Sequence, residues 1–358
     1  MDLTVERRDL RAAVRALIAK ADVGQSPWPR LSGEIGVAGL AVPQRYGGAG
    51  AGLAEICVVM EELGRNLTPT PMLGSAVLAT AALLASGDDA ACERLLPAMA
   101  DGSAIAAIVW TTEPGHWDIA EVACEAGDGD GGWELSGEAH YVLDGDTADV
   151  LLVAARTPDG TGLFEVDPRG DRVTCAAATT MDGSRRLAVV RLAGARGRRV
   201  GGDAAGPLAF ARDQACVALS AEQVGAAARA LDLTVRHLLT RTQFGQVIGG
   251  FQALQHRAAD LYVLVESARS LSRAVASEAD EADGTARPGP GSRAAAAKVY
   301  CSEVLTQTAS EMIQLHGAIG VTWEHQAHRY LKRAHGSRYL FGSPARYLAT
   351  IAASLIDS

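Results

Sequence analysis

The sequence predicts an α+β fold that is mainly helical, with one β block between two helical regions. Apolar residues recur at helical spacing near both ends of the chain, and short strand-like runs fill the middle. Helices, then strands, then helices in this order exclude a Rossmann-type alternation. We therefore expect three domains, covering residues 1–107, 108–205 and 206–358 of the 358-residue chain.

The first region carries two apolar stripes with the spacing of amphipathic helices. The stripes comprise Leu10, Val14, Leu17 and Ile18, and then Ile56, Val59, Met60 and Leu63. The run 78–85 is almost wholly apolar and predicts part of a buried helix. The segment 40–50 holds three glycines and a proline, which is typical of a loop.

The middle region changes to short runs of strand composition. These runs are Ile105–Trp110, Trp133–Leu135, Val150–Ala155, Gly162–Val166 and Leu187–Leu192. Turn signals separate them at 127–132, 144–145 and 158–160. Short strands at this spacing predict a small antiparallel barrel or sandwich.

The last region returns to long helical patterns. Their apolar positions are Val224, Ala228, Leu231, Val235 and Leu238; Leu254, Ala258, Leu261 and Val265; and Val304, Leu305, Thr308, Met312 and Leu315. Between the second and third patterns, residues 279–293 contain acidic residues, glycine and proline, which predicts an exposed linker.

Composition excludes several classes of protein. The net charge of −9 argues against a nucleic-acid binder, which needs a basic surface. No apolar run approaches the roughly 18–20 residues of a membrane span, and the N-terminus has no apolar signal segment. Six cysteines without paired spacing predict reduced thiols in a cytoplasmic protein, with Cys57 and Cys301 buried. His237 and His316 lack ligand partners at helical spacing, and His256 has only Asp260, which makes too few ligands, so we expect no metal site.

Residues 241–252 join two of the long helical patterns and combine a cation with glycines. The guanidinium of Arg241 can hold a diphosphate with two hydrogen bonds. Phe244 offers an aromatic face to adenine or ribose, and the glycines allow close backbone approach. Taken alone, the segment also fits a plain helix–loop–helix connection with an incidental arginine.

Residues 314–325 follow the third long pattern and carry a second set of such groups. The amide of Gln314 can bond to a phosphate or ribose oxygen. Gly317 and Gly320 permit main-chain N–H groups to face the same ligand. Trp323 and Glu324 are expected at the start of a further helix.

As a pair, these segments resemble the two FAD-pyrophosphate segments of the acyl-CoA dehydrogenase family. Weaker similarities lie along the rest of the chain, in the same order as in the family. They are the segment 28–50, the turn Thr111–Gly115 that resembles a flavin-contacting turn, Gly137-Glu138 and Ala148-Asp149. The resemblance thus covers essentially the whole chain, although only the two C-terminal segments are highly specific.

The resemblance implies a helical N-terminal domain, a central β domain and a C-terminal four-helix bundle that oligomerises. It implies FAD as cofactor, with Thr112 in the flavin-contacting turn and Tyr141 as an aromatic wall. The implied reaction is 2,3-dehydrogenation of an acyl-CoA, with electrons passing to an electron-transfer acceptor protein. The implied assembly is a homo-oligomer, or an α2β2 heterotetramer with a second acyl-CoA dehydrogenase-like chain.

The carboxylate that takes the α-proton in this family is missing from its usual place. Phe341 stands at the common glutamate position, and Ala215 stands at the alternative one. Asp213 and Glu222 are weak substitutes, because neither shares the position of Ala215 on a helix. Simpler roles are open to both: a charge near a helix N-terminus for Asp213, and a surface or inter-subunit ion pair for Glu222.

The flavin side also departs from the family pattern. Residues 116–118 replace a Gly-Ser-Asp, and Leu143 replaces a hydrogen-bonding threonine. In the second cofactor segment, Ala318 stands where a second glycine is usual. The ADP-binding edge thus survives, while the ring pocket and base are weak. This asymmetry favours a subunit whose base comes from a partner chain. The alternatives are a redirected flavoenzyme, such as an oxygenase or oxidase, and a non-catalytic scaffold.

Overall fold

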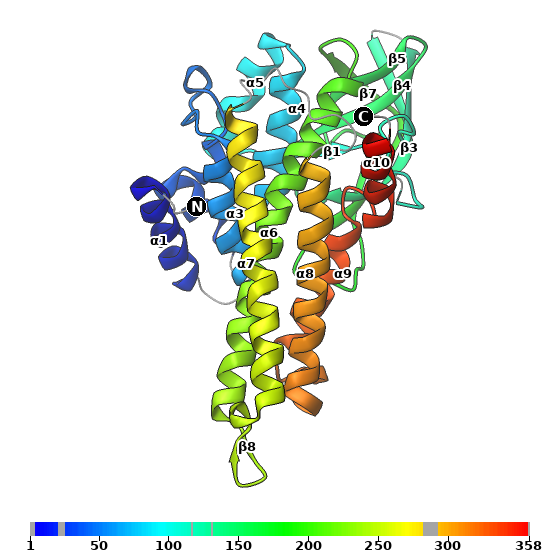
Figure 1. Cartoon of the computed structure of the whole chain (residues 1–358). Coiled ribbons are helices and arrows are strands. Elements are labelled where there is room, and N and C mark those ends of the chain that lie inside the picture. The colour runs from blue at the N-terminus through cyan, green and yellow to red at the C-terminus, as the bar shows by residue number, and fades with distance from the viewer. Residues whose placement is uncertain (1–3, 21–25, 116, 130–131, 282–292, 357–358) are drawn as a thin grey trace. The chain divides into compact units, whose positions relative to one another are not determined.

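The computed structural model describes residues 4–20, 26–115, 117–129, 132–281 and 293–356 (Figure 1). The chain divides into two compact units. One, here called the helical unit, comprises Met1–Arg11, Cys57–Thr68 and Cys216–Ser358. The other, the mixed unit, comprises Ala12–Ile56 and Pro69–Ala215. The N-terminal helices are thus divided between the two units. The predicted boundaries of the three domains stay a prediction.

The first third of the chain is helical, with several short 3-10 and π segments. In order these are α1 (Val5–Ala19), α2 (Trp28–Arg30), η1 (Leu31–Ile35), η2 (Val37–Gly39), η3 (Gln44–Tyr46), α3 (Leu53–Arg65), η4 (Met72–Ala79), α4 (Thr80–Ala85) and α5 (Asp89–Ala100). The start of α5 shows why one of them begins where it does. The Asp88 carboxylate accepts a hydrogen bond from the backbone N–H of Ala91 at 2.9 Å, which caps the helix.

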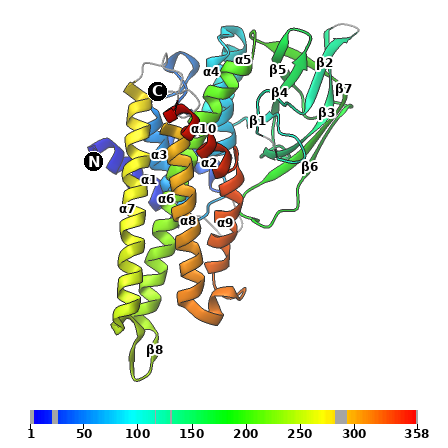
Figure 2. The ribbon, with the colours of Figure 1, turned by 45° about the vertical axis from the view of Figure 1, so that its right-hand side comes forward.

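Seven strands then form one sheet in the mixed unit (Figure 2). They are β1 (Ala106–Val109), β2 (Cys124–Gly129), β3 (Gly132–Leu143), β4 (Val150–Thr157), β5 (Gly160–Val166), β6 (Val173–Ala177) and β7 (Leu187–Val200). The order β4-β2-β3-β7-β5 returns to β4, so five strands close a barrel, with β1 and β6 added at β4 and β7. The predicted small barrel is confirmed, and most of its pairs are antiparallel.

The sheet differs from the sequence prediction in two respects. The pairs β1–β4 and β2–β4 are parallel, because the chain crosses over before it re-enters the sheet. Strands β2 and β6 were not predicted, since glycine, acidic and small residues dominate them. The predicted turn at 127–132 overlaps the ends of β2 and β3, and its residues 130–131 lie outside the described residues.

The barrel interior is filled by alternate strand residues. Fully buried members include Cys124, Leu135, Val153, Phe164 and Val190. The ring of Trp133 packs on that of Phe164, with centroids 5.3 Å apart. The barrel is therefore a packed core rather than a ligand channel.

The C-terminal half is built from long helices, and most of it belongs to the helical unit. The elements are α6 (Ala205–Thr240), β8 (Thr242–Gln243), β9 (Gln246–Val247), η5 (Ile248–Gly250), α7 (Gln252–Glu281), α8 (Arg293–His316), η6 (Gly317–Val321), α9 (Ala327–Tyr339) and α10 (Pro344–Ile356). Helices α6, α7 and α8 run side by side, and the β8–β9 hairpin closes one end (Figures 1 and 2). Most of the predicted linker, residues 282–292, lies outside the described residues. Within the described ranges, no helix is long and apolar enough to cross a membrane.

Small residues let the helices of this unit approach closely. Gly64 on α3 faces the carbonyl of Glu222 on α6, and Gly225 on α6 faces the carbonyl of Glu61 on α3. A Cβ atom on either glycine would lie 2.0 or 1.9 Å from that oxygen, so only glycine fits at this crossing. Cys57 and Cys301 are buried, as predicted.

Buried charges tie the same helices together through polar contacts. The Glu61 carboxylate pairs with Arg11, Arg269 and Arg273. Although burial opposes its charge, these three cations hold the pKa of Glu61 below its ordinary value. The Lys298 ammonium is fully buried and donates to the carbonyls of Ser337 and Arg338, which closes the last turn of α9.

Candidate functional site

The first predicted cofactor segment forms the tip of the β8–β9 hairpin. Arg241 directly follows α6, and its backbone N–H donates to the carbonyl of His237 at 2.9 Å. Phe244 and Gly245 form the two-residue turn, with φ angles of 54° and 77°. The Phe244 side chain is 90% exposed there. The turn thus holds an aromatic ring out in solvent, at a backbone conformation that is costly for phenylalanine.

The second segment lies at the end of α8. The Gln314 side chain is exposed on the last turn of the helix. Gly317 ends the helix with a φ of 65°, and no atom lies within 4 Å of where its Cβ would be. Gly320 is buried, and a Cβ there would lie 2.9 Å from the carbonyl oxygen of Ile313. Trp323 and Glu324 precede α9 by several residues rather than opening it, so their predicted place at a helix start was wrong.

Three histidine rings in contact join these two segments. The rings of His237 at the end of α6 and His316 at the end of α8 stack with centroids 4.4 Å apart. The ring of His325, on the turn before α9, makes a second, tilted contact with the ring of His316, with centroids 4.4 Å apart. We call this set the histidine column. It brings segments far apart in sequence, which contain Arg241 and Gln314, to the same end of the helical unit.

Hydrogen bonds define the tautomers of two rings in the column. His316 Nδ1 lies 2.7 Å from the carbonyl oxygen of Met312, so this nitrogen carries the ring hydrogen and donates a hydrogen bond to that oxygen. His325 Nδ1 accepts from the backbone N–H of Ala327 at 3.2 Å, which satisfies an orphan donor at the start of α9. Burial lowers the pKa of all three rings, and that of His316 falls to about 4. The column is therefore neutral near pH 7.

The column gives the helical unit a predictable pH dependence. Because the pKa of His316 falls from 6.5 to about 4 on folding, the unfolded chain binds more protons between these two values. The contribution of His316 to the free energy of unfolding is fully present above pH 6.5, and it declines as the pH falls toward 4. As the pH falls through this window, we expect the melting temperature of the unchanged protein to fall. In His316→Gln, we expect it to fall by several degrees less. An equal fall in both proteins would contradict the expectation.

In the mixed unit, Tyr141 covers the turn that resembles a flavin-contacting turn. Its hydroxyl donates to the carbonyl of Glu113 at 3.3 Å, and its φ is 56° where β3 is irregularly paired with β7. The Thr112 hydroxyl is buried and has no hydrogen-bond partner among the described residues. Leu143, at the position of the family's threonine, is buried. His116 lies outside the described residues.

The two family positions for a catalytic glutamate are filled by buried apolar side chains. Phe341 is 1% exposed, with a φ of 65°, and its carbonyl accepts a bond from the Tyr347 hydroxyl at 2.8 Å. Ala215 is fully buried. No carboxylate stands at either position.

The two substitute carboxylates have environments that the sequence did not predict. Glu222 forms a buried ion pair with Arg333 of the same chain, rather than a surface or inter-subunit pair. Asp213 lies eight residues inside α6 and is buried, so it is not a helix-terminal charge. Burial raises the pKa of Asp213 to about 6, although Arg212 opposes this. This pKa suits Asp213 to accept a proton.

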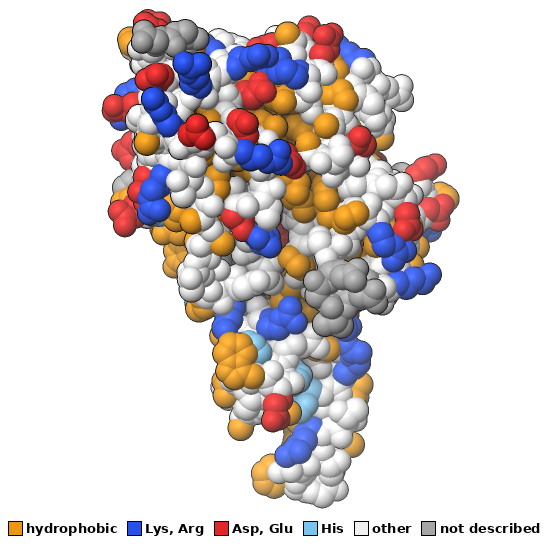
Figure 3. All heavy atoms as spheres, turned by 180° about the vertical axis from the view of Figure 1, so that it is seen from behind, with side chains coloured by type: hydrophobic (Ala, Val, Ile, Leu, Met, Phe, Trp, Pro, Cys, Tyr) orange, Lys and Arg blue, Asp and Glu red, His pale blue; other side chains and the backbone are white. Residues whose placement is uncertain are grey.

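The groups at the hairpin end of the helical unit fit a diphosphate. Arg241 is exposed, and within the described parts of the chain its guanidinium pairs with no carboxylate. Gln314 and the open Gly317 lie at the same end, and histidine side chains reach the surface beside basic and apolar ones (Figure 3). Across the described ranges, no group of three or more His, Cys, Asp or Glu residues could hold a metal ion.

Comparison with known proteins gives a consistent match. The acyl-CoA dehydrogenase N-terminal domain model matches residues 4–103, and the C-terminal domain model matches residues 212–356. Acyl-CoA dehydrogenase IpdE2 of Mycolicibacterium smegmatis is 38% identical over 99% of this chain and 100% of its own length. IpdE2 of Mycobacterium tuberculosis is 38% identical over 97% and 92%.

Solved structures give the same fold. A structure described as "Tcur3481-Tcur3483 steroid ACAD G363A variant" is 30% identical, with a TM-score of 0.84 and 98% of both chains covered. Butyryl-CoA dehydrogenase from Megasphaera elsdenii is 20% identical, with a TM-score of 0.90 and 99% of both chains covered.

Proposed function

Because this chain belongs to the acyl-CoA dehydrogenase family and is an oxidoreductase acting on CH–CH groups, we propose that it is one subunit of an FAD-dependent enzyme that forms a 2,3-enoyl-CoA. The observation that carries the proposal is the histidine column, which brings the Arg241 and Gln314 segments to one end of the helical unit. Two phosphate-binding segments side by side make a diphosphate site.

The residues that we assign to cofactor binding form two separate groups, one in each unit, and each group binds part of an FAD molecule. Arg241 binds the diphosphate with two charge-assisted hydrogen bonds, Gln314 bonds to phosphate or ribose, and Gly317 lets the main chain approach. Phe244 packs on adenine or ribose. Thr112, whose hydroxyl has no hydrogen-bond partner among the described residues, offers it to the flavin ring, and Tyr141 forms one wall. FAD, when bound, supplies the hydride acceptor of the reaction.

The α-proton needs a base, and we propose that a partner chain supplies it. Both family positions hold apolar side chains, and Glu222 is neutralised by Arg333. A 30%-identical relative is described under two joined names, Tcur3481 and Tcur3483, as a steroid ACAD, which supports a two-chain assembly here. A second copy of this chain is the other possible partner, with Asp213 as the base. An electron-transfer protein as acceptor and a cytoplasmic location stay predictions.

Replacing Arg241 tests the diphosphate site. We expect Arg241→Ala to weaken FAD binding by about 10- to 100-fold, because a charge-assisted hydrogen bond contributes about 1.5–3 kcal/mol. The measurement is flavin absorbance per chain after gel filtration, with the assembly purified as it occurs. Arg236→Ala is a matched control, since Arg236 is exposed on the last turns of α6 and bonds to the carbonyl of Asp232. Unchanged flavin content in Arg241→Ala would reject the proposed site.

The same absorbance measurement on the chain purified alone decides between the two assemblies. About one FAD per chain, with dehydrogenase activity lost in Asp213→Asn, would mean that two copies of this chain suffice. A colourless chain that gains flavin and activity only with a second acyl-CoA dehydrogenase-like chain would support the mixed assembly. A colourless, inactive chain in every combination would reject the proposed function.

A further inference from the structure

His237 stands where a second cation would be useful to a bound diphosphate. It lies one helical turn before Arg241, and the backbone N–H of Arg241 donates to its carbonyl oxygen. The ring is half-buried, and its inner face is covered by His316 at 4.4 Å. Burial lowers the pKa of His237, and the charges of His325 and Arg241 lower it further. The ring is thus fixed in place beside the proposed anion site.

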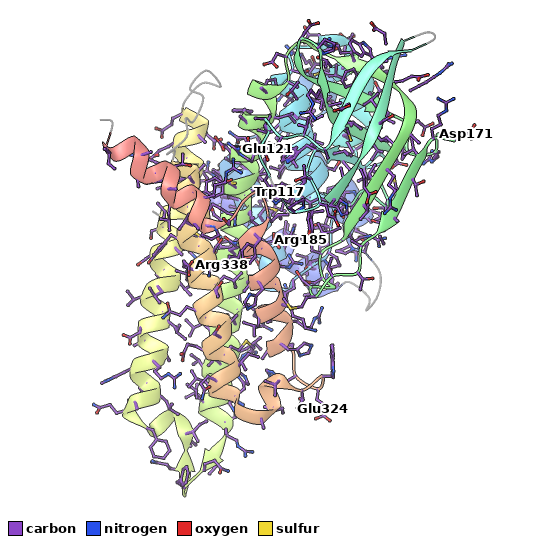
Figure 4. The ribbon with its side chains drawn as sticks, turned by 90° about the vertical axis from the view of Figure 1, so that its right-hand side faces the viewer. Trp117, Glu121, Asp171, Arg185, Glu324 and Arg338 are labelled. Carbon is purple, nitrogen blue, oxygen red and sulfur yellow. The ribbon has the colours of Figure 1, made fainter. Side chains whose placement is uncertain are left out.

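The surroundings of the ring oppose its charge when no anion is present. Three elements contribute the groups around it: Arg241 after α6, His316 on α8 and His325 on the turn before α9, with His328 of α9 behind His325. Glu324 is exposed on that turn (Figure 4). The groups whose charges lower the pKa values of the rings are arginine and histidines, which are cationic or can become so.

A bound diphosphate reverses this balance. Its negative charge neutralises Arg241 and favours the imidazolium form of any adjacent histidine. The three rings of the column differ in how readily they can accept the proton. His325 would lose the bond from Ala327 at its Nδ1, and His316 is buried. His237 has neither restriction.

We propose that His237 is a further diphosphate-binding residue of this site, which takes up a proton as the anion binds and then donates a hydrogen bond to a phosphate oxygen. His316 and His325 are positioning residues that hold the ring in place. The inference rests on the proposed function, because Arg241 must bind the same diphosphate. Thermodynamic linkage then requires tighter binding at lower pH, over the range in which the free ring is neutral and the bound ring is charged.

The test is isothermal titration of FAD into the flavin-free full-length protein, with any partner chain that co-purifies. FAD is the appropriate probe because its pyrophosphate is a diester and has no terminal phosphate with a pKa near 6. Titrations in two buffers of different ionisation enthalpy give the number of protons taken up. We expect roughly half a proton per site at pH 6 and almost none at pH 8.

The variant His237→Gln keeps a hydrogen-bond donor but cannot be charged. We expect it to take up no proton, to bind FAD about tenfold more weakly at pH 6 and to match the unchanged protein at pH 8. His256→Gln is the matched control, since His256 is exposed on α7, outside the column. Tight FAD binding without proton uptake would overturn the role of His237 and leave the diphosphate site intact. No FAD binding at either pH would overturn both.

Discussion

Replacing Arg333 by methionine is expected to destabilise the protein by about 3–5 kcal/mol, because it leaves the Glu222 carboxylate buried without its cation. The Arg333 side chain is 3% exposed, and that of Glu222 is 6% exposed. The two residues connect α9 to α6 inside the helical unit. Removing one charge of such a pair costs more than the pair itself contributes, since the remaining ion cannot reach water. The measurement is the free energy of unfolding in urea, followed by circular dichroism.

A double variant separates this effect from simple loss of packing. Arg333→Met with Glu222→Leu removes both charges and keeps most of the buried volume. We expect it to recover most of the stability that Arg333→Met loses, since an apolar pair of similar size replaces the ion pair. If the double variant is as unstable as the single one, the cost comes from shape and the electrostatic explanation is wrong.

Replacing Gly225 by alanine is expected to cost about 3 kcal/mol or more, or to prevent folding. The added Cβ would lie 1.9 Å from the carbonyl oxygen of Glu61 and 2.7 Å from its carbon. Both are backbone atoms, so no side-chain rotation can relieve the overlap, and α3 must move away from α6. That movement would also disturb the Glu61 carboxylate and its three arginines. Thermal unfolding of the purified variant gives the measurement.

Two controls sharpen this result. Gly33→Ala places a Cβ with no atom within 4 Å, so we expect a change within about 0.5 kcal/mol. Gly64→Ala should match Gly225→Ala, because its Cβ would lie 2.0 Å from the carbonyl oxygen of Glu222. A mild effect at Gly225 together with a severe one at Gly33 would contradict the proposed helix crossing.

The fold was predictable because periodicity records which face of each element is buried. The stripe of Val224, Leu231 and Leu238, for example, belongs to a helix with all three residues buried. Strands β2 and β6 escaped prediction because glycine, acidic and small residues such as Asp128 and Cys175 dominate them. Their place comes from backbone pairing with β3 and β7, which no local pattern encodes.

The candidate site was predictable in its parts but not in its connections. Arg241, Gln314 and the glycines were identifiable by residue type and spacing. The histidine column was not, because stacking depends on where three distant segments end in space. Residue type also does not show whether a side chain is buried. Glu222 was therefore predicted in a surface or inter-subunit ion pair, and Asp213 near a helix end. One signal was available and unused: Glu61–Gly64 and Glu222–Gly225 share the spacing Glu-x-x-Gly at the helix crossing.

The way the chain builds its helical unit has a consequence for synthesis on the ribosome. The unit joins residues 1–11, 57–68 and 216–358, whereas most of the mixed unit comes from the continuous stretch 69–215. The partners of Glu61 on α7, Arg269 and Arg273, therefore leave the ribosome more than two hundred residues after it. Until α6 and then α7 have left the ribosome, these helices do not cover the face of α3 around Glu61 and Gly64, and apolar surface exposed in this way is what chaperones bind during translation. The β barrel, complete earlier, can fold while the chain is still growing.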